Sequence, residues 1–121
     1  MSDSPLIQLR PDRVDGVAIL DLLPREMTEP EEAARLSEGL RAVATMVGSN
    51  RFLINATTTK YMSSTAFAVL ISFGLRTDEA GGRVALCGLD PFVRVGADIV
   101  RLGRIIPIYE DEATALAALI V

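Results

Sequence analysis

Three consecutive hydroxyl residues, Ser63, Ser64 and Thr65, stand in the segment TKYMSSTAFAVLISF, residues 59–73. The apolar residues that follow recur at helical spacing and predict a buried helix that begins at about residue 64. One hydroxyl there can cap the helix by accepting a hydrogen bond from a free backbone N–H group. The remaining hydroxyls can accept a phosphoryl group, because a helix N-terminus favours the charge of about −2 that this group adds.

Few other side chains of this sequence favour catalysis. The chain contains no histidine, which excludes Ser-His-Asp and Cys-His mechanisms and most zinc sites. The single cysteine, Cys87, lies in the apolar run VALCGL and predicts a buried structural thiol in a reducing compartment. We therefore expect a binding protein with no catalytic residue, no metal site and no cofactor, and not an enzyme.

The composition and charge of the chain limit the number of domains, the kinds of partner and the cellular location that can be expected. The 121 residues, of which 50% are hydrophobic, predict a single globular domain over residues 1–121. A net charge of −4 argues against nucleic acid or an anionic membrane surface as the partner. The N-terminus lacks a basic and apolar leader, and the longest apolar run falls short of the ~20 residues that span a bilayer. We expect a soluble cytoplasmic protein that does not insert into a membrane.

The order of elements predicts an α/β fold, with a central, mostly parallel sheet, an antiparallel edge hairpin and about four packed helices. The expected strands cover residues 6–10, 17–22, 51–56, 83–89 and 104–109. The expected helices cover about residues 28–47, 64–78 and 90–102, with a final helix from about residue 110 to the end.

Local signals mark several boundaries of these elements. Asp15 and Gly16 predict the hairpin turn. Thr28 is the expected N-cap of the first helix, with Pro30 in the first turn and Glu31 completing a capping box. Gly48 is expected to stop this helix.

The third helix has its own cap signals. Asp90 and Pro91 form an N-cap and N1 pair, and Gly103 is the expected C-cap after Leu102. Pro107 is compatible with a strand only at an edge or near a strand end.

The hydroxyl cluster is expected at the carboxyl edge of the sheet, where ligand sites gather. The segment GLDPF, residues 88–92, would lie beside it, since successive β-α turns meet at this edge. Phe92 then either joins Met62 and Phe67 in an apolar contact patch or lies partly buried at a helix start. Asn55 either bonds to the hydroxyl loop or makes a local turn contact.

The segment RFLINATTTKYMSSTAFAVL, residues 51–70, resembles the STAS domain of anti-sigma factor antagonists. In that family a strand leads to the motif fiDSSGLgvL, whose second serine is phosphorylated by the anti-sigma factor acting as a kinase. In the resemblance Ser63 replaces the aspartate, Ser64 matches the first serine and Thr65 matches the phosphoacceptor. The closing segment VRVGADIVRLGRIIPIYEDEATALAAL is also similar to the family, so the resemblance covers nearly the whole chain.

The resemblance implies an anti-sigma factor, a serine/threonine protein kinase, as the partner, and a regulatory phosphate on Thr65, with Ser64 as the alternative acceptor. The implied partner-binding residues are Met62, Ser63, Ser64, Thr65, Phe67, Asp90 and Phe92. Ser63 and Ala66 depart from the motif, since they replace an orienting carboxylate and a flexible glycine. Two other functions stay open: a stressosome-type scaffold, in which copies of the domain assemble into a homo-oligomer, and the STAS subunit of a phospholipid-transport ABC complex.

Overall fold

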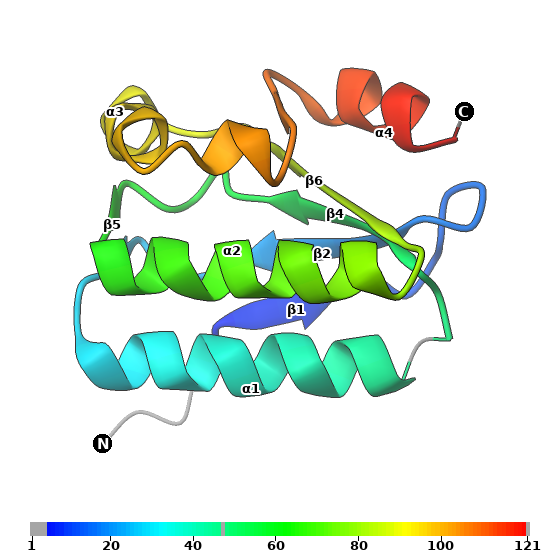
Figure 1. Cartoon of the computed structure of the whole chain (residues 1–121), viewed down its shortest axis with the longest axis horizontal. Coiled ribbons are helices and arrows are strands. Elements are labelled where there is room, and N and C mark those ends of the chain that lie inside the picture. The colour runs from blue at the N-terminus through cyan, green and yellow to red at the C-terminus, as the bar shows by residue number, and fades with distance from the viewer. Residues whose placement is uncertain (1–4, 47, 121) are drawn as a thin grey trace.

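The structure is a computed structural model that describes residues 5–46 and 48–120. Within these residues a five-stranded sheet has the order β1-β2-β4-β6-β7 (Figure 1). Its strands are β1 (Ile7–Leu9), β2 (Ala18–Leu22), β4 (Arg51–Asn55), β6 (Arg83–Cys87) and β7 (Ile108–Tyr109). The β1-β2 pair is antiparallel and the other neighbours are parallel, so the predicted sheet with its antiparallel edge hairpin is confirmed.

The described residues form four α-helices. They are α1 (Pro30–Met46), α2 (Ser64–Glu79), α3 (Pro91–Ile99) and α4 (Glu112–Ile120). Figure 1 shows α1 and α2 running side by side in the same direction, with α4 on the other side of the sheet. The buried side chains accordingly form two clusters, a larger one that includes residues of α1, α2 and α3 and a smaller one that includes residues of α4.

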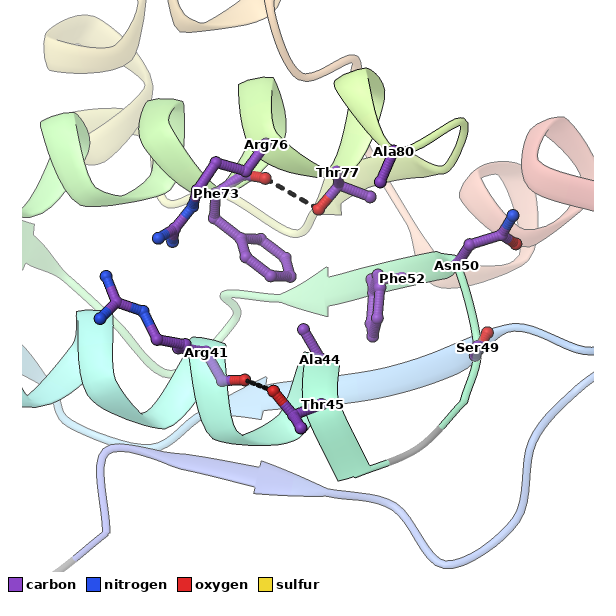
Figure 2. Close-up of a pocket in the computed structure, with 10 residues that line it drawn as sticks. All are labelled: Arg41, Ala44, Thr45, Ser49, Asn50, Phe52, Phe73, Arg76, Thr77 and Ala80. Atoms are coloured by element: carbon purple, nitrogen blue, oxygen red, sulfur yellow. Dashed lines mark hydrogen bonds between the residues drawn. The ribbon is translucent and has the colours of Figure 1, made fainter.

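The central strand β4 contributes to both clusters. Phe52 and Ile54 belong to the larger cluster and Leu53 to the smaller one, because successive side chains of a strand point to opposite faces. The ring of Phe52 packs edge-on against Phe73 of α2, with 5.4 Å between the ring centroids (Figure 2). The continuous apolar run of this segment is thus explained by burial on both faces.

The hairpin turn between β1 and β2 is confirmed. Asp15 and Gly16 both have positive φ, at 50° and 84°, as a two-residue primed turn requires. Val14 and Val17 close the turn with a bridge in which each backbone N–H donates to the carbonyl of the other residue.

The predicted N-cap of α1 is wrong by one residue. The helix begins at Pro30, so Glu29 is the residue before it. The carboxylate of Glu32, not of Glu31, accepts hydrogen bonds from the backbone N–H groups of Glu29 at 2.8 Å and Thr28 at 3.0 Å. Proline fits the first helical position because its missing N–H would have no partner there. At the other end of the helix, Gly48 has a left-handed φ of 62°, as expected of a helix stop, while Val47 lies outside the described residues.

The predicted end of α3 is also wrong. The helix ends at Ile99, and Arg101 adopts a left-handed φ of 58° before a short 3₁₀ turn over Leu102–Arg104. This reversal buries Leu102 and Ile106 in the larger core, so tertiary packing ends the helix before Gly103. The expected strand over residues 104–109 is reduced to the two residues of β7, directly after Pro107.

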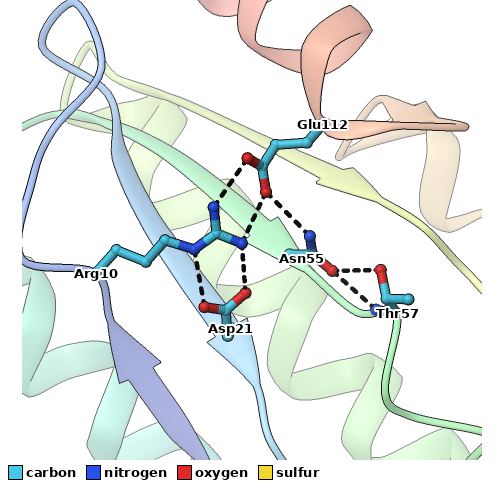
Figure 3. A network of polar contacts seen from close by, with 5 residues as sticks. All are labelled: Arg10, Asp21, Asn55, Thr57 and Glu112. Carbon is cyan, nitrogen blue, oxygen red and sulfur yellow. Dashed lines mark hydrogen bonds and ion pairs between the residues drawn. The ribbon is translucent and has the colours of Figure 1, made fainter.

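A polar network holds the N-terminus of α4 against the sheet (Figure 3). Arg10 donates two hydrogen bonds to Asp21 of β2, at 2.8 and 2.9 Å, and one to Glu112 at 2.8 Å. Asn55 at the end of β4 also donates to Glu112, at 3.1 Å. The hydrogen bond from Arg10 lowers the pKa of Glu112, more strongly than partial burial raises it. The network therefore stabilises the position of α4 only while Glu112 is ionised.

We expect Glu112→Gln to lower the free energy of unfolding by about 1 kcal/mol at about pH 7, since the ion pair is partly solvated. A carboxyl with a lowered folded pKa stabilises the fold above its unfolded pKa, and this stability is lost as the pH falls through the folded pKa. The difference between wild type and variant should therefore shrink towards about pH 3, as measured by urea unfolding. Glu110→Gln, which removes an exposed carboxylate next to the network, is the control, and an equal loss at both pH values would contradict the assignment.

Candidate functional site

The hydroxyl cluster lies at the N-terminus of α2, beyond the carboxyl end of β4 (Figure 1). Ser63 is the N-cap: its backbone is extended and its Oγ accepts a hydrogen bond from the N–H of Ala66 at 3.1 Å. The capping role, which the sequence left open between Ser63 and Ser64, therefore belongs to Ser63. Ser64 and Thr65 are exposed in the first turn of the helix, so neither is required for the cap.

A second, two-stranded sheet holds the segment that precedes the hydroxyls. It pairs β3 (Glu26–Met27) with β5 (Tyr61–Met62) in parallel, and the N–H of Ser63 continues the contact by donating to the carbonyl of Met27 at 2.8 Å. Upstream, the buried Thr59 donates its hydroxyl to the carbonyl of Pro24 at 2.7 Å. This sheet was not predicted from the sequence, because strands of two residues have no alternation pattern that could reveal them.

The loop after β6 lies beside the hydroxyl segment, as predicted. Asp90 caps α3 by accepting a hydrogen bond from the N–H of Phe92 at 2.9 Å. Its other carboxylate oxygen lies 3.5 Å from Nζ of Lys60, just ahead of β5. The rings of Tyr61 and Phe92 are in contact across the same junction, with 6.2 Å between their centroids. The two turns therefore form one continuous surface.

One residue of the predicted contact patch is not at this surface. Phe67 is only 3% exposed and belongs to the larger core. Its ring lies so close to Gly96 of α3 that a Cβ atom there would be 2.9 Å from Phe67 Cε2. Phe67 thus packs α2 against α3, which corrects its expected place in the patch. Met62 is half-buried against the same core.

The exposed apolar surface is instead extended along α3. Phe92, Val95 and Ile99 are 74%, 60% and 75% exposed and lie at spacings of three and four residues, on one face of the helix. Of these three residues only Phe92 was predicted from the sequence, because the buried face of this helix is also apolar, with Val93 and Ala97 in the core. We call Tyr61, Phe92, Val95 and Ile99 the apolar face.

Two further predictions concern residues near the opposite face of the sheet. Asn55 makes the local turn contact, since its Oδ1 accepts a hydrogen bond from the N–H of Thr57 at 3.0 Å. Cys87 is buried, and this burial raises the pKa of its thiol to about 11.

The described part of the chain contains no cluster of three or more potential metal-ligating side chains of the His, Cys, Asp or Glu type. No helix in that part is long and apolar enough to cross a membrane.

This arrangement of helices and strands is typical of a known protein family. Residues 21–115 match the sequence profile of the STAS domain. The chain belongs to the STAS domain family. This match spans every element of the STAS domain described above except β1, the start of β2 and the second half of α4. No curated protein sequence matches the chain.

Solved structures share the fold of this STAS domain at low sequence identity. A putative anti-sigma factor antagonist from Thermotoga maritima is 20% identical, with a TM-score of 0.79 and 93% of each chain covered. An anti-sigma factor antagonist from Mycobacterium paratuberculosis is 18% identical, with a TM-score of 0.78 and 98% of each chain covered. The Bacillus cell fate determinant SpoIIAA in its phosphorylated form is 14% identical, with a TM-score of 0.66, over 93% of this chain and 97% of that one.

We expect Ser63→Ala to lower the free energy of unfolding by about 1 kcal/mol, because the N–H of Ala66 loses its acceptor. Ser64→Ala and Thr65→Ala are the matched controls and should each change it by less than about 0.5 kcal/mol, since both residues are exposed. Urea unfolding followed by circular dichroism measures all three. If Ser64→Ala lowered the free energy of unfolding as much as Ser63→Ala does, the assignment of the cap to Ser63 would be wrong.

Proposed function

We propose that this STAS domain is an anti-sigma factor antagonist, a binding protein rather than an enzyme. Its partner would be an anti-sigma factor that is also a serine/threonine kinase, bound in the cytoplasm. The observation that carries the proposal is the pair of exposed hydroxyls, Ser64 and Thr65, on the first turn of a helix next to the apolar face. Structural relatives that are themselves described as anti-sigma factor antagonists support it.

The chemistry of the helix start supports a phosphate on Thr65. The first turn of a helix leaves backbone N–H groups without intrahelical acceptors, and the helix dipole favours negative charge there. Phosphorylation would therefore add a dianion without unfolding α2. Ser63 is a poorer acceptor, because its Oγ is already bonded to the N–H of Ala66. SpoIIAA, which shares the fold, occurs in a phosphorylated and an unphosphorylated form.

The apolar face supplies the reason why such a phosphate would act as a switch. Binding through Phe92, Val95 and Tyr61 gains from removing apolar surface from water. A dianion at the edge of the contact would have to lose its hydration against apolar or acidic groups of the partner, which disfavours binding. The unphosphorylated form is therefore the binding form in this proposal.

We expect the cognate kinase and ATP to phosphorylate Thr65, as mapped by mass spectrometry. Thr65→Ala should abolish the modification and retain partner binding, while Thr65→Glu should weaken binding at least about tenfold, since it mimics the charge. Ser64→Ala is the control and should be phosphorylated normally. Phosphate on Ser64 alone would transfer the acceptor role to that residue, and its absence from both would make this a constitutive binding domain.

Partner binding itself is tested independently of phosphate. Phe92→Ala should weaken the complex about tenfold or more in calorimetric titration, because a large exposed ring at the centre of an apolar patch behaves as an anchor. Ile120→Ala, which truncates an exposed apolar residue of α4, is the matched control and should leave the affinity unchanged. Equal effects of the two substitutions would place the interface elsewhere.

A further inference from the structure

A pocket of about 290 Å³ lies between the C-terminal ends of α1 and α2 (Figure 2). It is at the opposite end of α2 from the hydroxyl cluster. The first residue of α2 that lines the pocket, Phe73, lies eight residues beyond Thr65, or about 12 Å along the helix axis at 1.5 Å per residue. The proposed partner surface and this pocket are therefore distinct, and neither depends on the other.

The interior of the pocket is largely apolar. It is lined by the rings of Phe52 and Phe73 and by the methyl groups of Ala44 and Ala80. Two threonines also line it, but their hydroxyls are already bonded within their own helices. Thr45 donates to the carbonyl of Arg41 at 3.0 Å, and Thr77 donates to the carbonyl of Phe73 at 2.8 Å. Neither hydroxyl group therefore needs a ligand in the pocket as its hydrogen-bond acceptor.

Two arginines lie at the rim. Figure 2 shows the guanidinium groups of Arg41 and Arg76 pointing into the space between α1 and α2. Neither group forms an ion pair or hydrogen bond with any side chain of the described residues, although the chain has 16 acidic residues. Both arginines are exposed, and an anion placed between their guanidinium groups would be attracted to both and would offset the repulsion between the two like charges. Guanidinium groups also match the planar geometry of a carboxylate.

The volume limits the size of the occupant. A cavity of about 290 Å³ holds the liquid volume of roughly ten water molecules, at the lower end of the range for small-molecule sites. An aliphatic chain of about eight to ten carbons matches this volume, because a methylene group and a water molecule are of similar size.

We propose that this pocket binds a medium-chain carboxylate, with its apolar tail over Phe52 and Phe73 and its carboxylate between Arg41 and Arg76. The apolar lining of the pocket would contact the tail, and the two arginines at the rim would pair with the negative charge of the carboxylate. The ligand is a free, monomeric molecule, because the volume of this open pocket has room for one short chain.

The binding experiment uses decanoate, below the concentration at which it forms micelles, and decanol as an uncharged analogue of equal length. Both are titrated into the full chain labelled with ¹⁵N, and amide signals are followed by NMR. Decanoate should shift the signals of Thr45, Thr77 and Ala80, and decanol should bind at the same place about tenfold more weakly or worse.

The matched variants test the arginines. Arg41→Gln/Arg76→Gln should weaken decanoate binding about tenfold or more and leave decanol binding unchanged. Arg25→Gln/Arg104→Gln removes the same charge from exposed arginines outside the pocket and should bind decanoate like the wild type. If the double variant does not fold, Arg76→Lys replaces it. This substitution keeps the charge but loses the planar donor pair, so it should also weaken decanoate binding.

Three results would overturn the proposal: equal affinity for decanoate and decanol, shifts confined to the residues of the apolar face, and no shift at any accessible concentration. None of them bears on the anti-sigma partner, because no partner protein is present in the experiment. Conversely, failure of Thr65 phosphorylation or of the Phe92 interface would leave the decanoate result intact.

Discussion

Burial of β4 on both faces is the constraint on which the rest of the structure depends. Phe52 and Ile54 hold α1 and α2 on one face, while Leu53 contributes to the core beneath α4 on the other. Because the strand has five residues, its two ends define two separate surfaces of the molecule. The hydroxyl cluster and the network around Glu112 lie beyond its carboxyl end, and the arginine pocket lies at its amino end.

At the carboxyl end of β4, the two faces of the sheet position different groups of residues. On one face the segment before α2 is fixed by the pairing of β3 with β5 and by the cap of Ser63, which leaves Ser64 and Thr65 exposed. On the other face Arg10 and Asn55 donate hydrogen bonds to Glu112 and so position the start of α4. The exposed hydroxyls at the start of α2 and the polar network at the start of α4 therefore belong to different faces of the sheet.

The residues of the candidate site differ in how well local sequence predicts them. The caps at Ser63 and Asp90 were predictable, because a cap joins a side chain to an N–H group two or three residues away. The burial of Phe67, which was expected in the contact patch together with Phe92, was not predictable. Phe67 is buried because Gly96 of another helix leaves room for its ring, while Phe92 stays 74% exposed with its ring against that of Tyr61.

The sequence by itself determined the order of the four helices and of the five strands of the main sheet, the mostly parallel pairing of those strands, and the place of three hydroxyls at a helix start. Periodicity and capping operate over a few residues, so a single segment contains all the information they need. Only the tertiary structure decided which face of α3 is exposed, that Arg10 meets Glu112 at a separation of 102 residues, and that Arg41 and Arg76 share one pocket. These contacts depend on how elements pack across the whole chain, and no local pattern contains the position of a distant partner.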